Sequence, residues 1–213
     1  MKCDKKTMLL YAVTDRAWVG KQSLYEQVES ALKGGVTCVQ LREKELEEDE
    51  FLEEAIEIAT LCKQYKVPFF INDNVDIAIK CNADGIHVGQ EDMIVTQVRQ
   101  KVGKDMMIGV SVHSVKEALE AVENGADCLG VGAMFSTSTK TDVDVLPKEV
   151  LKNICEAVGV PVVAIGGIGK GNLLELSGTG VDGVALVSAI FAAEDIETEC
   201  RLLRKMSEDM VNL

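Results

Sequence analysis

Short runs of apolar residues alternate with longer segments of helical character along the whole chain. Residues 162–165 read Val-Val-Ala-Ile, and residues 69–71 and 128–131 are similarly apolar. Continuous runs of this kind are typical of parallel strands covered on both faces, since a half-exposed strand would alternate polar and apolar positions. The predicted strands are residues 9–13, 36–41, 67–71, 85–88, 106–110, 128–131, 162–165 and 183–187, and the predicted helices are 23–33, 48–65, 75–81, 93–102, 114–124, 147–158, 171–177 and 196–210.

Eight strand-helix alternations predict an α/β fold of the (β/α)8 TIM-barrel type. No change in composition marks a linker, so residues 1–213 are predicted to form a single domain. A doubly wound nucleotide-binding fold is disfavoured, because no Gly-x-Gly-x-x-Gly motif follows the first strand and no Walker-type loop is present. In a TIM barrel the functional residues gather after the strands, at one end of the barrel.

Composition and charge narrow the possible partners. The chain of 213 residues has 47% hydrophobic residues and a formal net charge of −13, which predicts one sizeable core and disfavours nucleic acid or an anionic membrane as a partner. No apolar run is long enough for a membrane span, and the N-terminal run is too short for a secretory signal, so a cytoplasmic protein is predicted. Seven scattered cysteines without a Cys-x-x-Cys pair predict buried thiols in a reducing compartment, and no zinc site is expected.

Two aspartates follow neighbouring predicted strands. Asp73 follows the third strand and Asp92 the fourth, 19 residues later. Because parallel barrel strands end on the same face, the two carboxylates are expected to converge there. Mg²⁺ commonly takes one or two carboxylates and completes its shell with water and substrate phosphate. The alternative is that each aspartate caps the helix that follows it, and this stretch alone leaves both interpretations open.

Further polar residues follow other predicted strands. Arg42 and Lys44 are two positions apart, so in an extended segment they share a face and can hold an anion together, although a solvated charge run would look the same. Ser111 could hydrogen-bond a ligand. Residues 135–142 are rich in hydroxyl groups around Lys140, a composition that suits either a lid closing on phosphate or an ordinary surface loop.

The two histidines receive structural interpretations. His87 lies within a predicted strand, where we expect a hydrogen-bonded core residue and no general base. His113 precedes the helix that starts near Ser114 and is predicted to cap it.

The loops after the seventh and eighth strands predict a phosphate site. Gly166-Gly167 ends the seventh strand and Ser188 follows the eighth. Glycine lets backbone N–H groups approach an anion, and these two loops form the usual phosphate site of TIM barrels. The sequence therefore predicts two separate anion-binding sites. One consists of Arg42, Lys44 and Lys140 with a metal on Asp73 and Asp92, and the other consists of the backbone at Gly167 and Ser188. Two phosphorylated small ligands are therefore expected, one of them charged enough to need a metal, as a diphosphate leaving group would be.

The joint order of these segments resembles the thiamine phosphate synthase family over nearly the whole chain. The resemblance implies a TIM-barrel transferase that joins 4-amino-2-methyl-5-pyrimidinylmethyl diphosphate to a thiazole phosphate and releases diphosphate. It further implies a dissociative mechanism, in which a pyrimidinylmethyl cation forms before the thiazole nitrogen captures it. The segments that carry the resemblance are residues 40–44, 72–73, 89–92, 109–111, 137–140, 164–168 and 187–188.

The same resemblance assigns roles to individual residues. It implies catalytic roles for Arg42, Lys44, Ser111 and Lys140, of which Arg42, Lys44 and Lys140 would stabilise the departing diphosphate together with Mg²⁺. It also implies that Asp73 and Asp92 hold the Mg²⁺ ion. The pyrimidine diphosphate would be bound by Gln40, Leu41, Arg42, Glu43, Lys44, Asn72, Ser111 and Lys140, and the thiazole phosphate by Thr137, Ser138, Thr139, Gly167, Val187 and Ser188.

Two positions depart from the family's frequent pattern. Ser136 and Ala133 stand where many relatives have proline, so fewer φ angles are fixed and a looser lid is expected. Two other functions fit the same fold. A thiazole tautomerase would not need the metal-diphosphate half of the site, and a non-catalytic regulatory barrel would need only one phosphate site.

Overall fold

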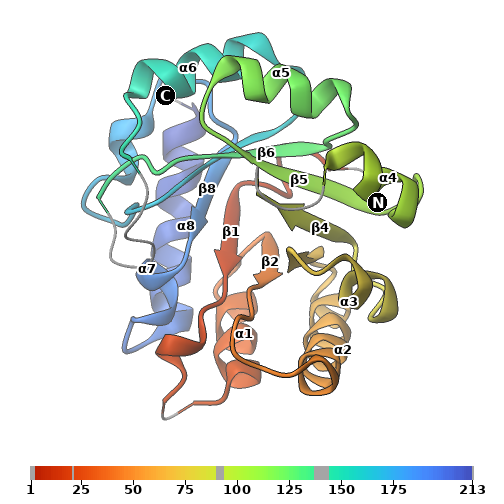
Figure 1. The fold of residues 1–213 in the computed structure, drawn as a ribbon. Coiled ribbons are helices and arrows are strands. Elements are labelled where there is room, and N and C mark those ends of the chain that lie inside the picture. Colours follow the sequence, from red (N-terminus) through yellow and green to blue (C-terminus); the bar gives the residue numbers. More distant parts are fainter. Residues whose placement is uncertain (1–2, 21, 90–93, 137–143, 213) are drawn as a thin grey trace.

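The computed structural model describes residues 3–20, 22–89, 94–136 and 144–212, and these form a barrel of eight parallel strands (Figure 1). Each strand pairs with the next, and β8 pairs with β1 to close the barrel. The predicted α/β TIM barrel is therefore confirmed. The strands are β1 (Leu10–Val13), β2 (Cys38–Leu41), β3 (Phe69–Asn72), β4 (Gly85–Val88), β5 (Met107–Val112), β6 (Cys128–Val131), β7 (Val162–Ile165) and β8 (Gly183–Leu186).

Helices surround the barrel and follow the predicted pattern closely. Two short elements were not predicted, the 3-10 turn η1 (Arg16–Trp18) and the helix α7 (Ser188–Phe191), because three or four residues carry no periodicity. The helix predicted at residues 171–177 is a shorter 3-10 turn, η2 (Leu173–Leu176). The other helices are α1 (Leu24–Lys33), α2 (Glu48–Tyr65), α3 (Val75–Lys80), α4 (Val95–Val102), α5 (Val115–Glu123), α6 (Lys148–Ala157) and α8 (Ile196–Asn212). In the part of the chain that is described, no helix has the length and hydrophobicity to cross a membrane.

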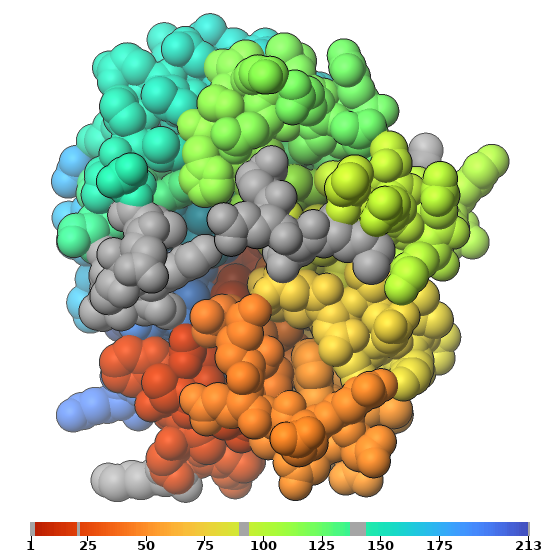
Figure 2. Space-filling view, in the orientation of Figure 1, coloured from red at the N-terminus to blue at the C-terminus, as the bar shows by residue number. Residues whose placement is uncertain are grey.

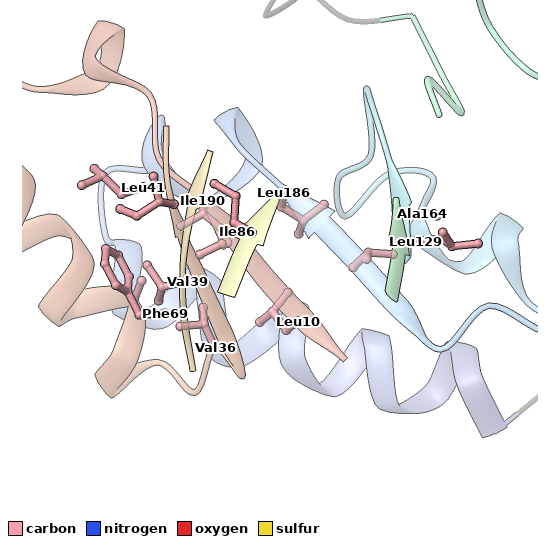
Figure 3. Close-up of a cluster of buried hydrophobic side chains, with 14 of the residues drawn as sticks. Leu10, Val36, Val39, Leu41, Phe69, Ile86, Leu129, Ala164, Leu186 and Ile190 are labelled. Atoms are coloured by element: carbon pink, nitrogen blue, oxygen red, sulfur yellow. The ribbon is translucent and has the colours of Figure 1, made fainter. Parts of the chain in front are cut away.

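The core has two layers, because successive side chains of each strand point to opposite faces. Residues such as Leu41 and Ile86 are fully buried between the strands and the helices (Figure 3). Residues such as Tyr11 and Phe70 fill the barrel interior, where their rings lie 5.7 Å apart. Gly85 makes this possible, since a Cβ there would lie 2.3 Å from the Phe70 ring. The interior is thus a packed core that supports whatever sits at the barrel mouth.

The turns that enter the four even-numbered strands share one structure. In each, a side-chain oxygen accepts a hydrogen bond of 2.8–3.0 Å from a backbone N–H at the start of the preceding odd-numbered strand. A residue with φ between +52° and +101° lies two positions earlier, and the residue between them is buried. These turns fix the amino end of the barrel, opposite the expected functional end. They are Gly35-Val36-Thr37, Asn82-Ala83-Asp84, Gly125-Ala126-Asp127 and Gly180-Val181-Asp182.

Arg99 joins two strand entrances at this amino end. Its guanidinium group donates hydrogen bonds to the carbonyl oxygens of Gly103, Met106 and Gly125, and to the Asp127 carboxylate. Arg99→Ala would leave these acceptors without their donor, and we expect the free energy of unfolding to fall by about 2–3 kcal/mol. Chemical denaturation measures this loss.

The matched control is Arg201→Ala on α8, where the side chain is 65% exposed and, within the described ranges, pairs with no residue but Glu197, one turn away. Its loss should stay within about 0.5 kcal/mol. Equal denaturation midpoints for the two variants would contradict a special role for Arg99.

Candidate active site at the carboxyl end of the barrel

The carboxyl ends of the strands bring together polar residues that are distant in the sequence. The segments after β1 and β2 lie side by side on the surface, in red and orange (Figure 2). Gln40, Asn72 and Ser111 lie near the ends of β2, β3 and β5, on the side of each strand that faces the barrel interior. Five residues with predicted roles lie outside the described part of the chain, namely Asp92, Thr137, Ser138, Thr139 and Lys140.

Asp73 is the acidic residue around which one side of the mouth is built. Its Oδ2 accepts hydrogen bonds from Lys44 Nζ and Asn72 Nδ2, both at 2.6 Å. Its backbone has a φ of 62°, a left-handed conformation that aspartate and asparagine tolerate better than most residues. The backbone N–H of Asp73 also donates to the His87 carbonyl at 2.8 Å, which extends the β3–β4 pairing to the mouth. The carboxylate is thus held by side chains from two neighbouring segments, and the Asp73 backbone is held by a third.

The alternative interpretation of Asp73 as a helix N-cap is wrong. The residue that caps α3 is Asn74, whose side-chain oxygen accepts a hydrogen bond from the Ile77 N–H at 3.0 Å. Asp73 stands one position too early for that role, so its carboxylate is free to point into the mouth, toward Lys44.

The two basic residues after β2 pair with different carboxylates. Arg42 Nη1 lies 3.1 Å from Asp15 Oδ2, whereas Lys44 pairs with Asp73. The Arg42 backbone N–H also donates to Thr14 Oγ1 at 3.0 Å. Both side chains remain partly exposed, 30% for Arg42 and 52% for Lys44. A ligand anion could therefore replace the carboxylates as their partner without first uncovering them.

Not all of residues 40–44 present side chains to the mouth. Leu41 is fully buried in the layer between barrel and helices, so only its backbone can contribute to a site at the mouth. Gln40 points inward, and its Nε2 donates to the Tyr11 hydroxyl at 2.8 Å. Glu43 is also buried.

His87 and Ser111 form a polar pair inside the barrel mouth. His87 Nε2 lies 2.9 Å from Ser111 Oγ, which confirms the prediction of a hydrogen-bonded histidine. A Cβ at Gly109 would lie 2.5 Å from His87 Nδ1, so glycine at this position makes room for the imidazole ring. The ring in turn fixes the position of the Ser111 hydroxyl.

The prediction that His113 caps α5 is wrong. The cap is Ser114, whose hydroxyl accepts a hydrogen bond from the Glu117 N–H at 3.2 Å. The Glu117 carboxylate accepts the His113 backbone N–H at 2.7 Å. The Ser114 hydroxyl stands directly before the helix and can accept a hydrogen bond from its first turn. The His113 imidazole, one residue earlier, does not take this position.

The loops after β7 and β8 lie on one pocket, as expected from their sequences. Gly167 and Ser188 both line it, together with Ser136 and Asn172, and it encloses about 410 Å³. Gly167 has a φ of 64°, and a Cβ there would lie 2.4 Å from the Ser136 carbonyl oxygen, so no side chain fits. The Val187 side chain packs against the inner core, and Val187 is not among the residues that line the pocket.

Asn172 is a pocket residue that the sequence analysis missed. Its Nδ2 donates to the Gly167 carbonyl at 2.9 Å, and its Oδ1 accepts from the Gly169 N–H at 2.9 Å. Both hydrogen bonds hold the glycine loop in one conformation. An asparagine in a loop gives no sequence signal for this function, because the partner atoms belong to the backbone.

Comparisons with known proteins agree with this geometry. A family model described as thiamine monophosphate synthase matches residues 10–190. Thiamine-phosphate synthase of Clostridium acetobutylicum is 49% identical over 194 residues, covering 91% of this chain and 92% of the relative. The thiamine-phosphate synthase of Ruminiclostridium cellulolyticum is 46% identical over 203 residues, which cover 95% of each chain. The solved structure of thiamine phosphate pyrophosphorylase from Pyrococcus furiosus has a TM-score of 0.90 at 40% identity, covering 97% of this chain and 98% of that one. The chain therefore belongs to the thiamine monophosphate synthase family.

Proposed function

We propose that this protein joins 4-amino-2-methyl-5-pyrimidinylmethyl diphosphate to a thiazole phosphate, forming thiamine monophosphate and diphosphate. The observation that carries the proposal is the cluster of Lys44, Asn72 and Asp73 at the mouth, beside a separate pocket at Gly167 and Ser188. Two anion-binding regions at one barrel end suit two phosphorylated substrates. The net charge of −13 supports small molecules rather than nucleic acid or membranes as partners, and we place the protein in the cytoplasm.

The residues after β2 would bind the diphosphate. Arg42 and Lys44 carry the positive charge, and with Lys140 they would stabilise the negative charge that grows on the diphosphate as it departs. Ser111 would donate a hydrogen bond to the same substrate. The amide groups of Gln40 and Asn72, both on the inner side of their strands, would orient the pyrimidine ring.

The donor set at Asp73 suits Mg²⁺. Among the described residues, both hydrogen bonds to the Asp73 carboxylate fall on Oδ2, so Oδ1 can take a hard cation. Mg²⁺ is commonly bound by one or two carboxylates plus substrate phosphate, so it does not require a cluster of three protein ligands. Asp73 and Asp92 would hold the ion. When bound, it would neutralise part of the diphosphate charge.

The thiazole phosphate would bind at the second pocket. Backbone groups of Gly167, Val187 and Ser188 would contact the phosphate, and Thr137, Ser138 and Thr139 would bind the same substrate. Because the reaction is dissociative, the C–O bond to diphosphate breaks first, and the thiazole nitrogen then captures the pyrimidinylmethyl cation. No side chain has to act as a base, and the main tasks of the chain are alignment and exclusion of water. Apolar groups below the mouth, including Val13 and Ile165, support that exclusion.

Asn172→Ala tests the second pocket. Loss of the two hydrogen bonds should let the Gly167 loop relax, and we expect the KM for the thiazole phosphate to rise about tenfold. The KM for the pyrimidine diphosphate should change less than about twofold, since Asn172 is distant from Lys44 and Asp73 along the barrel. Steady-state kinetics with each substrate varied in turn measures both values. Asn124→Ala, at the exposed end of α5, is the control.

The central experiment incubates the purified protein with both substrates and Mg²⁺. Thiamine monophosphate and diphosphate should appear in equal amounts, and excess EDTA should stop both until Mg²⁺ is restored. A protein that leaves the pyrimidine diphosphate intact would not be a synthase. A rate that EDTA leaves unchanged would contradict the metal site.

A further inference from the structure

One buried carboxylate organises the loop that follows β2. Oε1 of Glu43 accepts hydrogen bonds from three consecutive backbone N–H groups, those of Lys44 at 2.7 Å, Glu45 at 2.6 Å and Leu46 at 3.3 Å. The Glu43 side chain is only 2% exposed. A single oxygen with three donors fixes the direction of the backbone on both sides of Lys44.

The second oxygen of Glu43 is held by Arg16. Nε of Arg16 donates to Glu43 Oε2 at 2.6 Å, and Nη2 donates to both carboxylate oxygens of Glu54 at 2.8 Å. Burial would raise the pKa of Glu43, but the hydrogen bonds from Arg16 and the backbone N–H groups outweigh it and hold the pKa below its usual range. The network therefore keeps a charged carboxylate inside the protein and ties η1, the loop after β2 and α2 together.

The residues just before Arg16 hold the other basic residue of the loop. Thr14 Oγ1 accepts the Arg42 backbone N–H, and Asp15 Oδ2 pairs with the Arg42 guanidinium group. Asp15 also accepts the Ala17 N–H at 2.9 Å, which shapes the turn that carries Arg16. The segment after β1 thus supports Arg42 directly and Lys44 through Glu43.

We propose that Arg16 and Glu43 are positioning residues for the diphosphate half of the active site. Arg16 holds the Glu43 carboxylate, and Glu43 holds the backbone from which Lys44 reaches the mouth. This inference rests on the proposed function. It replaces the substrate contact that the family resemblance implies for Glu43, because both carboxylate oxygens are occupied, and a carboxylate facing a diphosphate would repel it.

The test compares substitutions at Glu43 with a matched control. Glu43→Ala removes the acceptor for all three N–H groups, whereas Glu43→Gln keeps a neutral acceptor for them and loses the ion pair with Arg16. Glu50→Ala removes the same charge from an exposed position in the first turn of α2, where it has no role in the loop. Kinetics is measured with each substrate varied in turn, and circular dichroism confirms that each variant is folded.

For Glu43→Ala we expect the KM for the pyrimidine diphosphate to rise at least about tenfold and kcat to fall, while the KM for the thiazole phosphate stays within about twofold. Glu43→Gln should recover part of the loss, and Arg16→Lys, which keeps the charge but not the fork, should resemble it. If Glu43→Ala does not fold, these two milder variants carry the test. Values equal to those of Glu50→Ala, or an equal rise in both KM values, would overturn the proposal.

A second measurement separates this inference from the proposed function. Inorganic diphosphate is titrated into the wild-type protein and the Glu43→Gln variant in the presence of Mg²⁺, with calorimetric detection. Weaker diphosphate binding by the variant supports the positioning function even if the wild-type protein makes no thiamine monophosphate. Equal affinities would overturn the inference while leaving a measured synthase activity intact.

Discussion

Replacing Asp73 by alanine is expected to lower kcat about 10³-fold while thiazole phosphate binding stays within about twofold. The carboxylate provides one of the two proposed metal ligands, and metal stabilisation of the departing charge contributes several kcal/mol to such reactions. The Asp73 carboxylate also lies 2.6 Å from Lys44 Nζ. Its loss should therefore remove a ligand of the proposed Mg²⁺ ion and also misplace the Lys44 ammonium group. The pocket proposed for the thiazole phosphate lies after β7 and β8 and should remain intact.

Asp73→Asn is the control that separates charge from backbone effects. Asp73 has a φ of 62°, and alanine in this region is strained by about 1–2 kcal/mol, whereas asparagine tolerates it. Asparagine keeps the shape and loses the charge, so it should be nearly as inactive as alanine but more stable. Single-turnover assays at several Mg²⁺ concentrations measure this, and Asp92→Ala should give the same kinetic result. Full turnover by Asp73→Asn with unchanged Mg²⁺ dependence would reject Asp73 as a ligand.

Lys44→Ala should lower kcat by about 10²–10³-fold, the loss typical of one group that stabilises transition-state charge. The Lys44 side chain is 52% exposed, so its contribution to folding is small and the effect should appear in catalysis rather than stability. Lys44→Arg should recover only part of the rate, because the guanidinium group is larger than the ammonium group that reaches Asp73. The measurement is diphosphate release at saturating concentrations of both substrates.

Lys80→Ala provides the matched control for Lys44. Lys80 is 49% exposed and pairs with Glu48, the first residue of α2, and it contacts none of the residues proposed to bind substrate or metal in the described part of the chain. Its removal changes the net charge by the same amount, so any general effect of charge on the anionic substrate should appear in both variants. If the two variants lose activity equally, Lys44 has no special position.

Local pattern was enough to predict the barrel. A parallel strand covered on both faces must be apolar throughout, and residues 162–165 show this directly, so the strand positions follow from the sequence alone. The four similar turns before the even-numbered strands were not predicted. Each consists of a glycine or asparagine, an apolar residue and a threonine or aspartate, and the N–H groups that they bind lie 15 to 27 residues away in the sequence.

Fewer of the active-site residues could be predicted, again because their partners are distant in the sequence. The positions after the strands, including Asp73 and Gly167, could be selected because a barrel brings its strand ends together. The supporting partners could not be selected. Arg16 is 27 residues from Glu43 and 38 from Glu54, and no spacing rule joins a 3-10 turn to a strand end and a helix. Among the described residues, Asn172 forms hydrogen bonds with backbone atoms alone, so its partners leave no trace in the sequence.

The four equivalent turns at the amino end of the barrel have the same structure and should be interchangeable. Each turn contains its own residue with positive φ, its own buried apolar residue and its own hydrogen-bond acceptor, so one tripeptide could replace another. The single substitution Asn82→Gly would make Asn82-Ala83-Asp84 identical to Gly125-Ala126-Asp127. These turns lie at the opposite end of the barrel from the proposed substrate sites. Substitutions that raise thermal stability can therefore arise at the amino end, and substitutions that change substrate binding at the carboxyl end, with little effect on one another.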